Sequence, residues 1–280
     1  MIVMAEYENL NDENPNGESV TEAPLAPAPA DLLGTAADPA LTEDLALALL
    51  KRADLHPDVL QQLVKNANAL KTRKVKIALV SHPHTPRHVS VPLARQFYTF
   101  DLMKVALSPG VPADVKVAID DVLISRLKAV TIGERLTLAR RASGRVAAAL
   151  LLDVETMDGK MVAGETGERA LGERKAKNAA TVARESRVMQ TALENSRLTE
   201  ALVIGSVLRV AASAALVHAV AHHPKWSLRQ EIRAALLRTE HLSLARALEF
   251  SREIPGSRLP ELLASSRLPA KIKDQLIRGI

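Results

Sequence analysis

The chain has no cysteine among its 280 residues. Disulfide bonds, thiolate metal sites and cysteine nucleophiles are therefore excluded, and we expect a protein of a reducing compartment, the cytoplasm. Aromatic residues are also scarce, at 2% of the chain. Strands favour aromatic side chains, and proteins that bind single-stranded nucleic acid stack bases on them. A β-rich fold and binding by base stacking are both disfavoured.

No hydrophobic run is long enough to suggest a membrane span. The most apolar stretch, 201–220, is interrupted by Gly205, Arg209 and His218, and an arginine near the middle of a span costs about 2.5 kcal/mol or more. We interpret this stretch as two buried helices. The start of the chain, MIVMAEYENLNDEN, lacks the basic region and the apolar run of a signal peptide.

Basic residues are absent from the first 50 positions, which hold ten of the 32 acidic residues. The rest of the chain carries all 37 lysines and arginines against 22 acidic residues. Residues 1–37 include the Pro/Ala-rich run APLAPAPA at 23–30, and we predict that they form a disordered acidic tail. Two interpretations of the basic body stay open: it binds a polyanion, from which the tail would shield it, or it is an ordinary solvated surface.

The chain does contain one short phrase that recurs at helix ends. Each copy is an apolar helical turn, a small polar or proline-containing step and the start of a new helix. The copies are ALVSHPHTP at 78–86, VALSPGVPA at 105–113, TALENSRLTE at 191–200, HAVAHHPKWS at 218–227 and LLASSRLPA at 262–270. This recurrence predicts an all-α fold in which short helix pairs stack in a row.

The pattern divides the chain into four parts. The tail of 1–37 is followed by a first helical block at 38–153, a flexible charged insertion at 154–185 with four of the 12 glycines, and a second block at 186–280. Predicted helices of the first block are 41–53, 57–68, 74–81, 86–96, 99–107, 112–128, 133–142 and 144–152. Those of the second block are 186–194, 198–209, 213–222, 227–238, 242–252, 258–265 and 270–278, of which the last is polar enough to cap the row.

The repeated segments resemble the HEAT-like and leucine-rich-repeat-variant repeats of bacteria. The similarity is carried by ALVSHPHTP, GERLTLARRASGRVAAALLLD, ALENSRLTEALV, AVAHHPKWSLRQEIRAALLR and LLASSRLPAKIKDQLI. The unit from Pro83 to Pro109 is shorter than a HEAT unit of about 40 residues, so short helices are expected. The resemblance implies a right-handed α-solenoid, an architecture that serves mostly as a binding scaffold.

Histidines are the first candidates for chemistry. His218 and His222 lie four apart on one predicted helix, a spacing that can present two imidazoles to a metal. His82, His84 and His88 surround the equivalent turn of another copy. Neither group has the acidic residues or the HExxH pattern that would complete a site, so a shared turn explains both groups better. The sequence also lacks GxSxG and a phosphate-binding loop, and we predict no catalytic residue, metal or cofactor.

Clusters of basic residues are the strongest functional lead. If they align on the inner wall of the row, they would form a groove for a phosphate backbone. The candidates for polyanion binding are Lys71, Arg73, Lys74, Lys76, Arg140, Arg141, Arg145, Lys225, Arg229 and Arg233.

The sequence thus favours a non-enzymatic scaffold that binds an unidentified protein partner through its helical surface, with no membrane attachment. The alternative is a nucleic-acid-binding solenoid that uses a basic concave groove. An enzyme is a weaker third hypothesis, since base excision would require aromatic stacking around the base. A continuous track of lysine and arginine would favour nucleic acid, whereas arginines paired with acidic side chains would favour the scaffold.

Overall fold

The computed structural model describes residues 30–152, 183–210 and 212–278, and all regular elements in these ranges are helical. The N-terminal part contains α1 (Ala30–Ala37), α2 (Glu43–Leu50), α3 (Pro57–Lys65), the 3-10 helix η1 (Ala69–Lys71), α4 (Arg73–Ser81), α5 (Arg87–Ala94), α6 (Thr99–Leu107), α7 (Ala113–Arg126), α8 (Ile132–Arg141) and α9 (Gly144–Leu152). A helix described over 183–193 follows. The C-terminal part contains α11 (Glu200–Val207), α12 (Ala214–His222), α13 (Gln230–Leu236), α14 (Leu244–Arg252), α15 (Leu259–Ala264) and α16 (Ala270–Arg278).

The all-α prediction is confirmed for these residues, and several helices begin at local signals in the sequence. Pro57 occupies the first turn of α3, where a missing N–H costs nothing. Thr131 and Glu134 form a capping box at α8, with both reciprocal hydrogen bonds present. The predicted helix start at residue 227 is wrong, because α13 begins three residues later, at Gln230.

The first helix is a correction to the predicted tail. Residues 1–37 were expected to be disordered, yet 30–37 form α1, and Ala36 is fully buried. Leu32 and Leu33 pack against the core, so the apolar residues of this segment suffice to dock it on α3, which it contacts. Residues 1–29 and 153–182, which include most of the predicted tail and insertion, lie outside the described residues.

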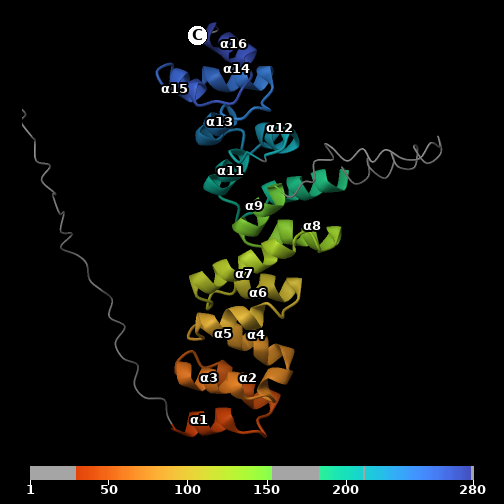
Figure 1. Cartoon of the computed structure of the whole chain (residues 1–280), viewed down its shortest axis with the longest axis vertical. Coiled ribbons are helices and arrows are strands. Elements are labelled where there is room, and N and C mark those ends of the chain that lie inside the picture. Colours follow the sequence, from red (N-terminus) through yellow and green to blue (C-terminus); the bar gives the residue numbers. More distant parts are fainter. Residues whose placement is uncertain (1–29, 153–182, 211, 279–280) are drawn as a thin grey trace, which may run out of the picture.

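The helices lie one above another in a long stack, with α1 at one end and α16 at the other (Figure 1). Many helices contact the helix two positions along the chain: α1 contacts α3, α2 contacts α4, α4 contacts α6, α5 contacts α7, α7 contacts α9, α9 contacts α11, α11 contacts α13, and α14 contacts α16. These contacts join odd-numbered helices to odd-numbered ones and even-numbered helices to even-numbered ones. One cluster of buried hydrophobic side chains, mostly leucine, valine and alanine, extends along the described residues from Ala36 to Leu276.

Candidate functional site

The recurring phrase ends in a turn whose polar side chain plays the same role in several copies. One atom of that side chain accepts a hydrogen bond from the backbone N–H two residues later, which tightens the turn. The acceptor-to-nitrogen distances are 3.0 Å for Asn66, 3.2 Å for His82, 2.7 Å for Asn195, 3.2 Å for His223 and 3.0 Å for Ser266. Asn66 lies outside the recurring phrases identified in the sequence, so the structure adds one copy of this turn.

The same turns also reach back to the end of the helix two positions earlier in the chain. Helix ends leave carbonyl groups without an intrahelical partner, and these side chains donate to them. Asn66 Nδ2 lies 3.1 Å from Ala36 O, Asn195 Nδ2 lies 2.8 Å from Ala139 O, and Ser266 Oγ lies 2.6 Å from Leu237 O. In the His223 turn, Trp226 makes this contact through its indole Nε1, 2.8 Å from Leu193 O. The recurring phrase is therefore a polar tie between successive layers of the stack.

The phrase at 105–113 departs from this pattern. Its polar residue, Ser108, donates to the carbonyl oxygen of Lys104 in its own helix, at 2.9 Å. A tie of the same kind is made by the next helix, α7, at whose end Arg126 Nη1 lies 2.7 Å from Phe97 O, just after α5. A long guanidinium thus supplies the donor that an amide or imidazole supplies elsewhere.

His82, His84 and His223 belong to these turns, whereas His88 lies in α5 and His218 and His222 lie in α12. His82 Nε2 lies 2.8 Å from Arg52 O, and its Nδ1 accepts from His84 N–H, so the neutral tautomer with the proton on Nε2 satisfies both ring nitrogens. His84 Nδ1 lies 3.0 Å from Leu55 O. The rings of His218 and His222 stack with centroids 4.1 Å apart. Within the described residues no group of three or more potential ligands is placed to hold a metal.

His82 gives the stack a sensitivity to acid. Burial lowers the pKa of His82 below its usual value, so the unfolded chain binds the proton more tightly than the folded one. The contribution of His82 to the free energy of unfolding is complete above its pKa in the unfolded chain, about 6.5. It is lost as the pH falls through the lower pKa that His82 has in the folded chain.

We therefore predict that in His82→Asn the free energy of unfolding falls less between pH 7.5 and pH 5 than in the unchanged chain. Asparagine does not titrate, and Asn66 shows that it can make the same two hydrogen bonds in an equivalent turn. At pH 7.5 the substitution should cost only about 0.5–1.5 kcal/mol, one hydrogen bond. Urea titrations at both pH values check this. His82→Ala should flatten the slope equally and cost more at both pH values. An unchanged slope in both variants would contradict the role given to His82.

The predicted polyanion-binding residues are placed apart, and several are paired within the chain. Arg73 bonds Asp101 at 2.5 Å, Lys74 bonds Glu43 at 3.2 Å, and Arg145 bonds Asp121 at 2.9 Å. Each pair connects helices two positions apart. Ion pairs thus run beside the polar ties as a second link between layers.

The remaining predicted residues make contacts of other kinds or are exposed. Arg233 is 7% exposed, pairs with Glu253 and lies over the ring of Phe250, so its charge is used inside the fold. Lys225 stands 4.0 Å from the centre of the Trp226 ring. Lys71 bonds Asn68 and Lys76 bonds Gln96. Arg140, Arg141 and Arg229 are exposed.

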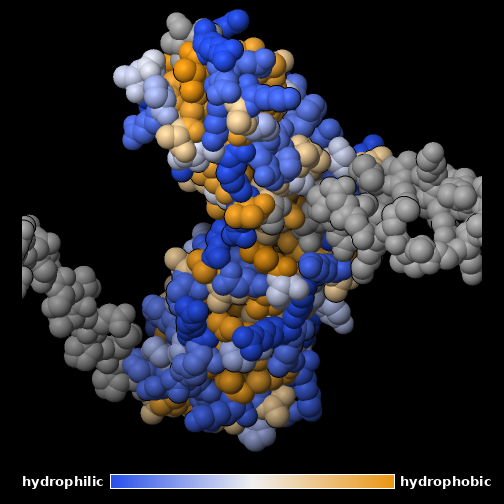
Figure 2. Space-filling model, turned by 45° about the horizontal axis from the view of Figure 1, so that its top comes forward, coloured by the Kyte–Doolittle hydropathy of each residue, from blue (hydrophilic) through white to orange (hydrophobic). Residues whose placement is uncertain are grey.

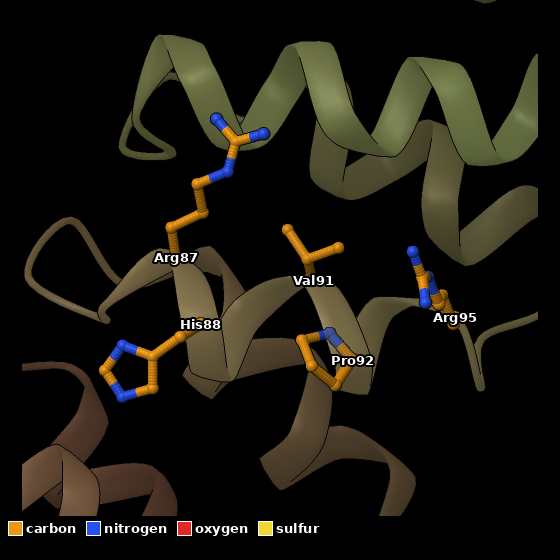
Figure 3. A pocket seen from close by; sticks show the side chains of 5 residues that line it. All are labelled: Arg87, His88, Val91, Pro92 and Arg95. Carbon is orange, nitrogen blue, oxygen red and sulfur yellow. The ribbon is translucent and has the colours of Figure 1, made fainter.

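An open groove of about 520 Å³ lies on α5 and is lined by Arg87, His88, Val91, Pro92 and Arg95. These residues fall on one face of the helix, with the arginines near its two ends and the apolar pair between them (Figure 3). Arg87 lies 3.5 Å from Asp114 of α7, and both side chains are more than half exposed. The groove is thus apolar along its floor and cationic at its ends.

A second surface feature is the outward face of α11. Ala201 and Gly205 are exposed and Ile204 and Leu208 are half-buried, a spacing that places all four on one side of the helix. A Cβ built on Gly205 meets no atom within 4 Å, so this face is open. In the space-filling view the side of the stack is hollowed between its N-terminal and C-terminal parts, and hydrophobic side chains reach the surface there (Figure 2).

Comparison with protein families, with curated proteins and with solved structures finds no match for this chain. Among the described helices, none has the length and apolar character needed to cross a bilayer.

Sequence reasoning missed both surface features. Arg87 and Arg95 were not among the predicted basic clusters, because they lie eight residues apart with apolar residues between them. That spacing on one helix face was the available signal. The α11 face was interpreted as part of a buried helix, since nothing in its composition separates its buried side from its exposed side.

Proposed function

We propose that the chain is a HEAT-like, right-handed α-solenoid that acts as a non-enzymatic scaffold and binds a protein partner through its helical surface. Two features support the architecture: the contacts between helices two positions apart and the ties that recur between layers. Stacked repeats of this type offer long surfaces for binding. A cytoplasmic location stays a prediction.

The observation that carries the binding proposal is the apolar face of α11. Scattered apolar residues on a surface are ordinary, but grouped ones on a single helix face favour a contact with another protein. The helix α11 itself packs against α9 and α13, so its outward face lies alongside theirs. A partner helix or an extended segment lying along these helices would cover it.

The pairing of basic residues bears on the alternative function. Arg73, Arg145 and Arg233 are each matched by a carboxylate of this chain, and a phosphate backbone would have to displace those carboxylates. A scaffold uses such pairs for its own cohesion. This pattern favours protein binding over nucleic-acid binding.

Gly205→Glu tests the proposal, because it places a charge in the middle of the α11 face. The side chain meets open space there, and glutamate is a better helix former than glycine by roughly 0.5–1 kcal/mol, so the fold should be kept. We expect a tenfold or larger loss of the partner captured from extracts of the native cell, measured by quantitative mass spectrometry after nuclease treatment.

Gly133→Glu on α8 is the matched control, since a Cβ at Gly133 also meets no atom within 4 Å. This variant should capture the partner as the unchanged chain does. Equal capture by all three proteins would refute a role for the α11 face. Capture that disappears on nuclease treatment would instead support the nucleic-acid alternative.

A further inference from the structure

The groove on α5 carries positive charge that the described part of the chain leaves largely uncompensated. Arg95 and His88 are exposed, and their side chains make no hydrogen bond or ion pair within the described residues. Arg87 has only its long contact with Asp114, at 3.5 Å. Val91 and Pro92 form an apolar floor between the two arginines (Figure 3). An acidic segment that also carries apolar side chains would match both properties.

The N-terminal segment 1–29 has this composition. It contains six carboxylates and no lysine or arginine. Its first 13 residues, MIVMAEYENLNDE, combine four of those carboxylates with Ile2, Val3, Tyr7 and Leu10. The apolar side chains suit the floor of the groove, and the carboxylates suit its ends.

The direction of the helices brings the segment to the groove. Asn66, just after α3, bonds the end of α1, so these two helices run in parallel. His82 and His84, just before α5, bond the loop that precedes α3, so the starts of α3 and α5 lie on one edge of the stack. Ala30, from which the segment departs, therefore lies on the same edge as Arg87.

The distance to be spanned is short. Packed helices are separated by about 8–10 Å, so the start of α5 lies roughly 20 Å from the start of α1. An extended chain covers about 3.4 Å per residue, and the stretch from residue 14 to residue 29 is long enough to cross that distance with slack.

We propose that the acidic segment 1–13 docks in the α5 groove of its own chain, with its carboxylates on Arg87, His88 and Arg95 and its apolar residues on Val91 and Pro92. The segment then acts as an internal competitor. An acidic ligand reaches the groove only by displacing it. This proposal does not depend on the scaffold function or on the α11 face.

The full chain can be tested directly because it contains no cysteine. Asn9→Cys places one label in the segment without changing its charge. Ser125→Cys places another on the exposed surface of α7, beside Arg126, which bonds the carbonyl oxygen of Arg95. A donor and an acceptor dye on the two cysteines report docking by energy transfer. We expect high transfer efficiency at low salt.

Charge reversal should release the segment. Arg87→Glu with Arg95→Glu should lower the transfer efficiency at least twofold, and so should 0.5 M salt, which screens charges beyond about 4 Å. The matched control, Arg252→Glu with Lys271→Glu on α14 and α16, makes the same change of net charge and should leave the efficiency unchanged. His88→Glu with Arg95→Glu is a second test that keeps the contact between Arg87 and Asp114.

The result that overturns the proposal is equal transfer in the unchanged chain and in both groove variants, each shown to be folded by circular dichroism. Transfer that rises with protein concentration would also overturn it, because the segment would then dock on a second copy of the chain.

Discussion

Replacing Asn195 by alanine is expected to lower the free energy of unfolding by roughly 2–4 kcal/mol, because its side chain makes two buried hydrogen bonds and one part-buried one, and each buried group left unpaired costs about 1–3 kcal/mol. Asn195 Nδ2 donates to Ala139 O at 2.8 Å and Ala142 O at 3.2 Å, and its Oδ1 accepts from Arg197 N–H at 2.7 Å. The residue is 2% exposed, so water cannot replace these bonds. Urea unfolding followed by circular dichroism measures the loss.

The location of Asn195 adds a qualitative expectation. Its bonds join the layers on either side of segment 153–182, so their loss should separate unfolding of the two parts into two transitions. Asn68→Ala is the control, because Asn68 is also an asparagine of a helix-linking turn but is exposed, and it should cost less than about 1 kcal/mol. Equal losses in the two variants would contradict the importance given to the buried tie.

The sequence predicted the positions of the helices well because their starts carry local signals. Pro57 and the Thr131–Glu134 capping box act within one helical turn and need no tertiary partner. The predicted start at residue 227 was wrong: residues 224–228 form turns and the N-cap of α13 is Arg229, which makes no side-chain cap. The carbonyl oxygen of Ser227 accepts instead from the guanidinium of the buried Arg233, a contact that no local pattern shows.

The recurrence of the turns was visible in the sequence, but their purpose was not. Asn66, His82 and Ser266 differ in chemistry and share a role only because each has an acceptor for its own turn and a donor for the layer below. The basic clusters show the reverse problem. Arg73 and Lys74 are neighbours in sequence but pair with different carboxylates, Asp101 and Glu43. A cluster of basic residues along the sequence therefore did not predict a continuous basic surface.

Gly144→Ala is the second large effect, and it concerns a close approach between backbones. Gly144 is the first residue of α9. A Cβ built there would lie 2.2 Å from the carbonyl oxygen of Arg197 and 3.0 Å from Leu202 Cδ1. The oxygen belongs to the turn that Asn195 ties to α8, so it cannot move without breaking those bonds. We expect alanine to destabilise the chain by about 2–3 kcal/mol, the usual cost of overpacking, measured by urea unfolding.

The sign of this effect makes it a sharp test, because alanine is intrinsically a better helix former than glycine by about 1 kcal/mol. Gly205→Ala on α11 is the matched control: its Cβ meets no atom within 4 Å, so the helical preference alone should act and stability should rise by about 0.5–1 kcal/mol. A loss of stability in Gly144→Ala together with a gain in Gly205→Ala would show that the contact between α9 and the 195–199 turn requires a residue without a side chain. A rise in both would mean that the two backbones lie farther apart in solution, and that Asn195 rather than Gly144 sets how closely the layers meet.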